Sequence, residues 1–427
     1  MSPRWIMCLC LTLVAACSER NNEPANAAPV GDEAIRFDWP QWQGPDRSTI
    51  CKETGLLTSW PKDGPPLAWK VNALGEGYST PSISQGRIFA MGNRDKTEYV
   101  ICLNERDGKE LWATETGPVR SNGGGYPGPR CTPTVDGDRV YAEGLNGDLV
   151  CLEAASGKVV WKKELKNKQE FDGRVGGWGY SESPLVDGDR LIVTPGGKLA
   201  TLAALDKNTG KVIWRSAVPS GESAAYASII IANVDGQKQY IQFLSRGVVG
   251  VSAADGKFLW RYDAPANGTA NCTTAIYEDG HVFAASNYGV GGGLAKLIRT
   301  SSGYNAQEVY FTKKMQNHHG GMVLKDGYLY GSGPQLTCLE FKTGNEKWTG
   351  RTGKGAVLYA DGHLIYRNEG GDIYLVEANP DKFVEKSKFK QPERTNRPAW
   401  PHPVIANGKL YIRDQGLLLC YDVKAKK

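Results

Sequence analysis

The sequence predicts an all-β protein, an eight-bladed β-propeller built from four-stranded antiparallel blades. Three observations predict this fold. A motif ending in tryptophan recurs about every 45 residues, and each repeat holds four short β-rich runs separated by Gly, Asn or Asp turns. The 427 residues also include 52 glycines and 12 tryptophans, which supply tight turns and large packing groups. Four-stranded sheets repeated at this period around an axis make a propeller.

The repeat is defined by five segments that end alike: "NERDGKELW", "EAASGKVVW", "LDKNTGKVIW", "AADGKFLW" and "EFKTGNEKW". An earlier segment, "PLAWKV", fits the same spacing. The six tryptophans are Trp69, Trp112, Trp161, Trp214, Trp260 and Trp348. The last two are 88 residues apart, about twice the period, and Tyr310 stands where the missing tryptophan is expected. We expect each of these tryptophans to dock one blade on the next, where burying on the order of 200 Å² is worth several kcal/mol.

The strands follow in order within each unit. In residues 181–216, "SPLVD" and "RLIVTPG" flank a Gly-Asp turn, and "ATLAALD" and "KVIWRSA" flank "KNTG", as in two consecutive hairpins. Counting such units gives seven complete blades. "HPVIANGKLYIRDQGLLLCYDV" supplies three further strands, and we expect the strand around Trp69 to join them as the fourth. This pairing closes the ring and removes its exposed sheet edges.

The first 17 residues predict a lipoprotein signal peptide. Arg4 precedes an apolar run of about a dozen residues, which suits a signal-peptide core and is too short to span a bilayer. The ending "LVAAC" resembles a lipobox with Cys17 as the lipidated residue, although an ordinary cleaved signal is the alternative. Residues 18–36 are polar and predict a flexible tether, and residues 37–427 are assigned to the propeller.

These features predict an exported, periplasm-facing lipoprotein of the outer membrane, held to the membrane by its lipid anchor only. The net charge of +5 is spread along the chain, so it gives no sign of nucleic-acid binding.

The segment "ALDKNTGKVIW" resembles the A-x-D-x-x-T-G-K-x-x-W repeat of the quinoprotein (PQQ-type) propeller family. The resemblance covers roughly residues 60–427. "WPQWQGPDR", residues 39–47, is similar to the segment that precedes the propeller in bacterial members. The resemblance implies an eight-bladed propeller but says little about activity, because the repeated residues serve blade docking.

The cysteines predict buried free thiols rather than a disulfide framework. Cys102, Cys151 and Cys338 each stand ten residues before a blade tryptophan, and Cys420 fills the matching place in the last blade. Ala or Gly holds this place elsewhere, as in a tight core position. Cysteines one blade apart exceed the roughly 7 Å limit between the Cα atoms of a disulfide. A bridge between Cys131 and Cys272, which lie in loops, stays open.

A candidate site is predicted where the eight connections between blades converge at one mouth of the central channel. These connections read "GEGYSTP", "GPRCTP", "GWGYSESP", "SAAYAS", "TANCTT", "NHHGG", "GKGA" and "AWPHP". Loops held on a rigid scaffold carry most binding sites. The ligand-binding candidates in or beside them are Glu76, Tyr78, Arg130, Trp178, Tyr180, Glu182, Tyr226, Asn271, His318, His319, Lys354, Trp400 and His402. The alternative is a channel whose polar side chains only hold water.

The adjacent histidines of "NHHGG" raise the question of a metal. Side chains alternate on an extended segment, so we expect only one of His318 and His319 to face the channel unless the glycines bend the chain. Zinc needs three or four ligands. His402 and Glu182 would complete such a set in a narrow channel, so the metal is left open.

The preferred functional hypothesis is a non-catalytic binding propeller that needs no cofactor. It resembles the propeller lipoprotein of the outer-membrane β-barrel assembly machinery. That resemblance implies envelope protein partners, such as periplasmic domains or nascent barrel strands, bound by the surface and mouth loops. A small-molecule ligand at the mouth is the other kind of partner.

The first alternative is a periplasmic quinoprotein dehydrogenase that oxidises alcohols or sugars with PQQ and Ca²⁺. The family resemblance implies PQQ stacked on Trp178 or Trp400, carboxylates paired with Arg130 or Lys354, and Ca²⁺ held by a carboxylate and an amide, here Glu182 and Asn271. The chain departs from the enzymes, since it has no Cys-Cys dipeptide, no Asp base in these loops and no C-x-x-C-H haem motif.

A further alternative is a carbohydrate-binding propeller. The aromatic residues of the mouth loops would then stack on sugar faces. These residues are Tyr78, Trp178, Tyr180, Tyr226 and Trp400.

Overall fold

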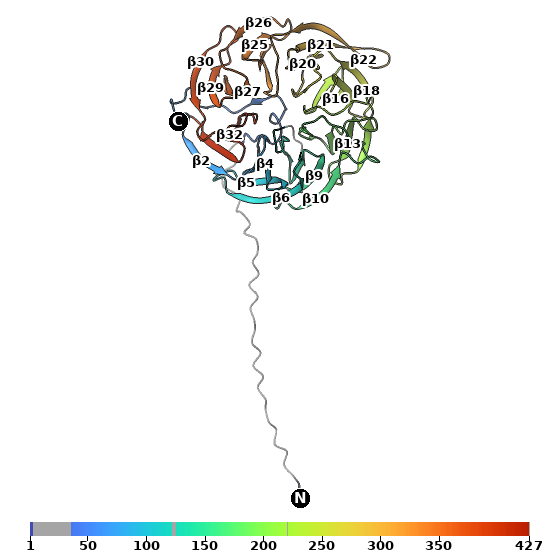
Figure 1. Cartoon of the computed structure of the whole chain (residues 1–427), viewed down its shortest axis with the longest axis vertical. Coiled ribbons are helices and arrows are strands. Elements are labelled where there is room, and N and C mark those ends of the chain that lie inside the picture. Colours follow the sequence, from blue (N-terminus) through green and yellow to red (C-terminus); the bar gives the residue numbers. More distant parts are fainter. Residues whose placement is uncertain (3–35, 122–124, 220, 427) are drawn as a thin grey trace. The chain divides into compact units, whose positions relative to one another are not determined.

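The computed structural model describes residues 1–2, 36–121, 125–219 and 221–426. The predicted signal peptide, its lipidation site Cys17 and nearly all of the predicted tether lie outside these residues. From Arg36 onward the chain forms one compact unit. Eight sheets are arranged in a ring, and all regular structure in the described residues is β (Figure 1). The predicted eight-bladed propeller is confirmed.

Each blade is an antiparallel meander that begins with its innermost strand. Blade 1 contains β3 (Ser82–Ser84), β4 (Arg87–Arg94), β5 (Thr97–Asn104) and β6 (Glu110–Pro118). Blade 2 contains β7 (Thr134–Asp136), β8 (Arg139–Glu143), β9 (Asp148–Glu153) and β10 (Val159–Glu164). Blade 3 contains β11 (Leu185–Asp187), β12 (Arg190–Val193), β13 (Leu202–Asp206) and β14 (Val212–Ser216). Blade 4 contains β15 (Ile230–Val234), β16 (Gln237–Phe243), β17 (Val248–Ser252) and β18 (Phe258–Tyr262).

The second half of the ring repeats this order. Blade 5 contains β19 (Ile276–Glu278), β20 (His281–Ser286), β21 (Gly291–Arg299) and β22 (Tyr304–Thr312). Blade 6 contains β23 (Met322–Lys325), β24 (Tyr328–Ser332), β25 (Leu336–Glu340) and β26 (Glu346–Thr349). Blade 7 contains β27 (Gly355–Ala360), β28 (His363–Asn368), β29 (Asp372–Glu377) and β30 (Glu385–Lys390). Blade 8 contains β31 (Val404–Ala406), β32 (Lys409–Asp414), β33 (Leu417–Asp422) and β2 (Leu67–Asn72).

The repeated motif is explained by the hairpin between the third and fourth strands. In blade 3, Asp206 Oδ1 accepts hydrogen bonds from the backbone N–H groups of Asn208 and Thr209 at 3.1 and 2.8 Å, which closes the turn. Gly210 follows with φ +69°, and a Cβ there would lie 2.9 Å from the ring of Trp161 in blade 2. Glycine is therefore required by both the backbone and the neighbouring indole.

The same contact recurs around the ring, because the large aromatic residue of one blade covers the hairpin glycine of the next. The pairs are Trp69 with Gly108, Trp112 with Gly157, Trp161 with Gly210, Trp214 with Gly256 and Tyr310 with Gly344. Four of the six tryptophans predicted to dock the blades make this contact, and Tyr310 takes the place of the missing tryptophan in blade 5. Trp260 instead lies against Gly250 of its own blade, and Trp348 Nε1 donates to the carbonyl of Asn379 in blade 7 at 2.8 Å.

The cysteine positions occupy the predicted tight place in the core. Each lies directly across from the blade tryptophan, as in the pairs Cys102 with Trp112 and Cys420 with Trp69. In blade 4 this position is Gly250, where a Cβ would lie only 2.2 Å from Trp260 Nε1. The cysteines of the described residues are free, so Cys131 and Cys272 are not bridged.

The ring closes as predicted. β2 pairs antiparallel with β33, and the register places Asn72 opposite Leu417. Arg413 of β32 reinforces the closure, because its Nη1 donates to the carbonyls of Ser79 and Met91 in the blade 1 region, both at 2.8 Å. The first and last parts of the propeller are thus joined by a sheet and by a buried arginine.

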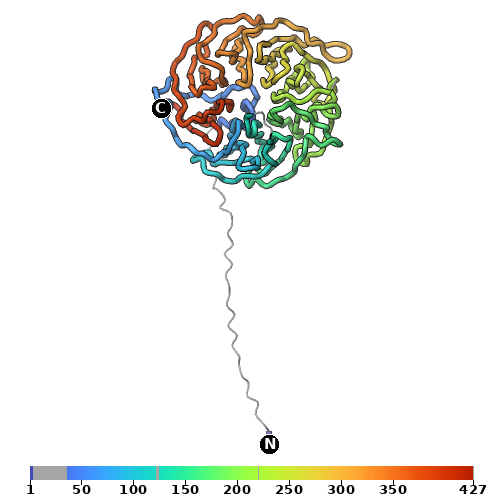
Figure 2. Tube along the Cα trace, in the orientation of Figure 1, coloured from blue at the N-terminus to red at the C-terminus, as the bar shows by residue number. Residues whose placement is uncertain are grey.

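The N-terminal segment of the ring has a role that the repeat does not predict. Residues 39–51 run through the middle of the ring, as the blue trace in Figure 2 shows. Arg47 is buried there and donates to the carbonyls of Ser183, Pro184 and Ile229 at 2.6–3.0 Å. The segment then pairs β1 (Ile50–Cys51) in parallel with β27, so blade 7 has five strands rather than the expected four.

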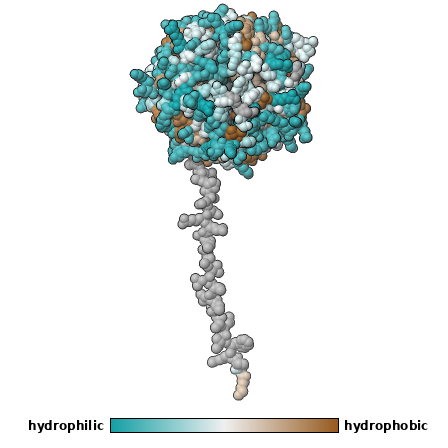
Figure 3. Space-filling model, in the orientation of Figure 1, coloured by the Kyte–Doolittle hydropathy of each residue, from teal (hydrophilic) through white to brown (hydrophobic). Residues whose placement is uncertain are grey.

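The outer surface is mostly hydrophilic on the face shown in Figure 3, with hydrophobic side chains at scattered places. Exposed examples on the outermost strands include Leu111, Val159 and Ile213. No helix among the described residues is long and apolar enough to cross a bilayer.

Candidate functional site

One face of the ring gathers two sets of loops. In an antiparallel meander, the connection from the fourth strand to the next blade and the turn between the second and third strands open on the same side. A cavity of about 380 Å³ lies among these loops in blades 1 to 8. Its position agrees with the mouth predicted from the sequence, and its size suits a small ligand or a few side chains of a partner.

Eight of the predicted candidates line this cavity: Tyr78, Arg130, Trp178, Tyr226, His318, His319, Lys354 and Trp400. Five others, Glu76, Tyr180, Glu182, Asn271 and His402, are not among its lining residues. The structure therefore brings together the aromatic and basic candidates, but separates them from Glu182 and Asn271.

Three of the five excluded residues have structural partners elsewhere. The hydroxyl of Tyr180 donates to the carbonyl of Pro195 at 2.7 Å. Glu182 is 3% exposed and its Oε2 accepts from the backbone N–H of Thr194 at 2.7 Å. The amide of Asn271 donates to the backbone carbonyls of Leu244 and Ser245 at 3.0 and 3.1 Å.

The other two lie at the edges of the site. His402 is buried with its ring against Trp42, and its Nε2 lies 2.7 Å from the carbonyl oxygen of His319. Glu76 is partly exposed and faces Arg397 at 3.8 Å. His402 and Glu182 therefore do not join the adjacent histidines in the ligand set considered from the sequence.

Several lining residues were missed by sequence reasoning. Glu369, Asn287 and Tyr288 come from turns between the second and third strands of their blades, which were not counted. Trp42 comes from the N-terminal segment and donates its indole N–H to Thr274 Oγ1 at 2.9 Å. The hairpin topology could have identified the residues in these turns, since the turns open on the same face as the connections between blades. The other missed lining residues are Thr80, Tyr126, Ser181, Ser228, Ala270, Cys272 and Pro398.

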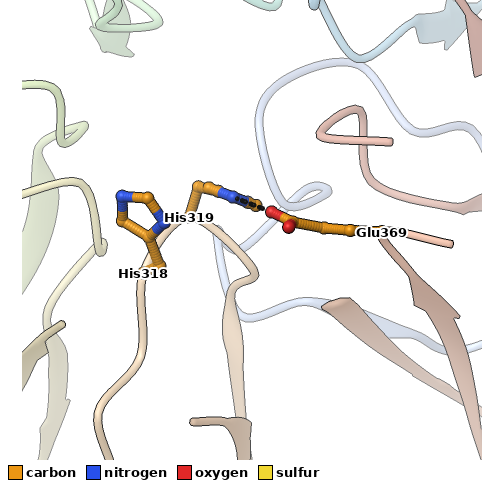
Figure 4. A group of neighbouring side chains, drawn as sticks. All are labelled: His318, His319 and Glu369. Carbon is orange, nitrogen blue, oxygen red and sulfur yellow. Dashed lines mark ion pairs between the residues drawn. The ribbon is translucent and has the colours of Figure 1, made fainter. Parts of the chain in front are cut away.

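A polar cluster lines part of the cavity, and Figure 4 shows three of its members, His318, His319 and Glu369. His319 Nε2 lies 2.6 Å from Glu369 Oε1, and Lys354 Nζ lies 3.1 Å from the same oxygen. Trp400 Nε1 also donates to this oxygen at 3.0 Å. Lys354 Nζ is 3.3 Å from His318 Nδ1, so the ammonium group bridges the carboxylate and the first histidine.

Both histidines reach the cavity, which answers the question raised by "NHHGG". Their ring centroids are 4.5 Å apart. The glycines bend the chain: Gly321 has φ +60°, and a Cβ on Gly320 would lie 1.9 Å from the carbonyl oxygen of Gly355. Only glycine permits this close approach of two backbones.

The protonation states follow from burial and from the charges nearby. Burial lowers the pKa of His318 to about 3 and lowers that of His319, so both imidazoles are neutral at pH 7. Burial alone would raise the pKa of Glu369, but the contacts with His319 and Lys354 outweigh it and lower the pKa to about 2. The cluster therefore holds one carboxylate, one ammonium and two neutral rings.

Next to this cluster, Trp400 is part of an aromatic wall that carries one positive charge, Arg130. Trp400 stacks near Tyr78 and Tyr126 at 4.6 and 4.7 Å between ring centroids. Arg130 donates to the carbonyls of Trp178 and Tyr126 at 2.9 and 2.8 Å, and no carboxylate pairs with it among the described residues. Such a wall can bind a flat or apolar group that carries a polar or negative edge.

Three glutamates, Glu98, Glu143 and Glu182, are buried outside the lining of the cavity. Glu98 has one oxygen that accepts from the backbone N–H of Leu145 at 3.1 Å, and its other oxygen has no partner within the part of the chain that the structure describes. Burial raises its pKa to about 8, raises that of Glu182 to about 8, and raises that of Glu143. Desolvation of the ionised form is the cause in each case.

Glu98 makes stability depend on pH. Its folded pKa is above the value of 4.5 in the unfolded chain, so its contribution is fully present below pH 4.5 and is lost as the pH rises through about 8. We expect Glu98→Gln to remove this loss. The free energy of unfolding of the variant, relative to the parent, should rise by roughly 2–4 kcal/mol between pH 4.5 and 8.5.

Guanidinium unfolding at the two pH values measures this difference. Glu115→Gln, at an exposed position on β6 of the same blade, is the control and should leave the pH dependence of the parent unchanged. Parallel pH curves for Glu98→Gln and the parent would contradict the account.

Comparison with known proteins identifies relatives of two kinds. A family model described as outer membrane protein assembly factor BamB matches residues 96–350, more than half of the chain. The outer membrane protein assembly factor BamB of Kangiella koreensis is 25% identical over 178 residues, which cover 40% of this chain and 38% of that protein. The quinohemoprotein alcohol dehydrogenase ADH IIB of Pseudomonas putida is 26% identical over 152 residues, 34% of this chain and 21% of that protein.

The chain thus spans well under half the length of either of these curated relatives. Among solved structures, the quinohemoprotein alcohol dehydrogenase of Comamonas testosteroni superposes with a TM-score of 0.64 at 13% identity, covering 92% of this chain and 81% of that one. Similarity at this level of identity establishes the fold.

Proposed function

The chain belongs to the family described as outer membrane protein assembly factor BamB, and on that premise we propose that it is a non-catalytic binding propeller of the cell envelope. In this proposal the protein is exported, anchored by a lipid on Cys17, and engages an envelope protein or a small ligand at the cavity. Relatives named as outer membrane protein assembly factors support the location and the kind of partner.

The residues that line the cavity are the main support for the proposal. Aromatic side chains and Arg130 line it, while residues 39–51 cross the channel and place Trp42 in its wall. Aromatic residues and arginine dominate the binding energy of protein interfaces, particularly where they surround a concave centre. The cavity is therefore suited to receive an apolar side chain from a partner segment.

Affinity purification from detergent-solubilised membranes tests the proposal. We expect the full chain to recover outer-membrane assembly proteins, and the double variant Trp178→Ala with Trp400→Ala to lose most of that recovery. His281→Ala is the control, since His281 lies in the first hairpin of blade 5 on the opposite face of the ring. Recovery of the protein alone, or equal recovery by all three proteins, would contradict partner binding at the cavity.

The lipid anchor needs its own test. Metabolic labelling with radioactive palmitate should mark the protein and place it in the membrane fraction. Cys17→Ser should abolish both results. A labelled Cys17→Ser variant, or an unlabelled parent, would contradict lipidation at Cys17.

A quinoprotein dehydrogenase is the second candidate, because Trp178, Trp400 and Arg130 line the same cavity and quinohemoprotein dehydrogenases are relatives. The residues fit the cofactor only in part. Glu182 and Asn271, the pair expected to hold Ca²⁺, are bonded to backbone groups outside the cavity lining. Titration of the protein with PQQ and Ca²⁺, followed by dye-linked alcohol oxidation, decides this candidate; absence of binding at tens of micromolar PQQ eliminates it.

A carbohydrate ligand is the third candidate. Four of the five aromatic residues that would stack on a sugar line the cavity, and Tyr180 does not. Oligosaccharide binding that is lost in Trp178→Ala with Trp400→Ala, without recovery of envelope proteins, would favour this candidate over a protein partner.

A further inference from the structure

The strongest unassigned feature is the group formed by His318, His319 and Glu369. One ligand atom from each lies within 4.8 Å of the others. The two histidines come from the connection between β22 and β23, and Glu369 comes from the turn between β28 and β29 (Figure 4). We propose that this group binds a divalent transition-metal ion, and that the Lys354 ammonium holds the place of the ion in its absence.

The donor set defines the class of metal. Two imidazoles and one carboxylate match the ligands of open zinc sites, in which a fourth position is left for water or substrate. Imidazole also suits Cu²⁺ and Ni²⁺, whereas Ca²⁺ and Mg²⁺ prefer oxygen ligands alone. Because all three residues line the cavity, the fourth position of the ion would open into it.

The carboxylate is already oriented for such a role. Trp400 Nε1 donates to Glu369 Oε1 at 3.0 Å and so helps to fix this side chain. Tyr288 likewise places its hydroxyl 3.1 Å from His318 Nε2, which leaves Nδ1 of that ring toward Lys354. Partners of this kind hold the ligands of metal sites in position.

One ligand is not satisfied without an ion. Both ring nitrogens of His319 are buried and make no aligned hydrogen bond among the described residues, although Nε2 lies 2.6 Å from Glu369 Oε1. A buried polar atom that lacks a hydrogen-bond partner commonly binds a water molecule or an ion. An ion bound by His319 together with Glu369 would give this ring a partner.

The ammonium group of Lys354 competes with a metal ion for the same ligand atoms. This group lies 3.3 Å from His318 Nδ1 and 3.1 Å from Glu369 Oε1, so it uses the electron pairs that an ion would take. Ion binding must move this side chain, and the competition weakens the affinity of the parent protein. Removing the ammonium group should strengthen metal binding while leaving all three ligands in place.

Calorimetric titration of the full chain with Zn²⁺ tests the proposal. We expect one Zn²⁺ per chain, and at least tenfold weaker binding in His319→Ala and in Glu369→Gln. Lys354→Met should bind at least tenfold more tightly than the parent. His281→Ala, which removes a histidine from a surface hairpin, should bind as the parent does.

Absorption of Co²⁺ in the visible range provides a second readout, because tetrahedral coordination by nitrogen and oxygen gives an intense band that loose surface binding does not. The band should be strongest in Lys354→Met and absent in His319→Ala. Thermal unfolding of each variant shows whether it is folded. No Zn²⁺ binding by folded Lys354→Met, or affinity that is unchanged in both ligand variants, would overturn the proposal.

Discussion

Arg413→Ala is expected to lower the free energy of unfolding by roughly 3–5 kcal/mol, because each buried carbonyl left without a donor costs about 1–3 kcal/mol. Arg413 is fully buried in β32. Its guanidinium donates to the carbonyls of Ser79, Met91 and Gln415 at 2.8–2.9 Å. Alanine would leave these carbonyls buried without donors at the junction between the last and first blades. Denaturant unfolding followed by fluorescence measures the loss.

Arg139→Ala is the matched control for Arg413→Ala. Arg139 begins the second strand of blade 2, and its salt bridge is with its exposed neighbour Asp138. An exposed pair of this kind is worth about 0–1 kcal/mol. Equal losses in the two variants would show that Arg413 does not join the ends of the ring.

Trp260→Ala is expected to cost roughly 3–5 kcal/mol of unfolding free energy, as do other replacements of a large buried aromatic residue. Trp260 is 2% exposed, and its Nε1 donates to Gln239 Oε1 at 2.7 Å. The indole lies over Gly250, which has no side chain to fill the space that alanine would leave. The buried amide of Gln239 would also lose a hydrogen-bond partner.

The comparison for Trp260→Ala is Trp112→Ala in blade 1, measured by the same denaturant unfolding. Trp112 is only partly buried, and Cys102 rather than glycine lies across from it. We expect a smaller loss for Trp112→Ala. A loss for Trp260→Ala that is no larger than for Trp112→Ala would contradict the role assigned to the Gly250 position.

The fold could be predicted because the repeated residues are those that pack one blade against the next. Four of the tryptophans and Tyr310 pack on a hairpin glycine of the next blade, and the cross-strand partners of the tryptophans are small, so the spacing and the residue sizes are both visible in the sequence. The segment at residues 39–51 could not be placed in the same way. Arg47 binds backbone carbonyls, which every residue carries, so its partners leave no signature in the sequence.

Only part of the candidate site was predicted correctly. The alternation of side chains between the two faces of an extended connection was considered only for the two histidines. Side chains on an extended segment alternate between two faces. Ser181 accordingly lines the cavity while its neighbours Tyr180 and Glu182 do not, and Cys272 lines it while Asn271 does not. Aromatic or charged character alone therefore selected some residues on the wrong face.

Glu369 was missed for a different reason. It lies in a turn within blade 7, whereas the candidates predicted from the sequence came only from the connections between blades. The connections between blades and the turns between second and third strands open on the same face of the ring. The strand topology would therefore have identified Glu369, whereas its residue type does not.

The central claim is that β2 closes the ring and so brings the mouth loops of eight blades together. The register places Asn72 opposite Leu417. Cross-strand Cα atoms about 4.5–5.5 Å apart are within the range of a disulfide. Peptide mapping of oxidised Asn72→Cys with Leu417→Cys tests the claim directly. We predict one peptide pair joined through positions 72 and 417, which is absent in each single variant. A folded protein whose two new cysteines stay free would contradict the closure.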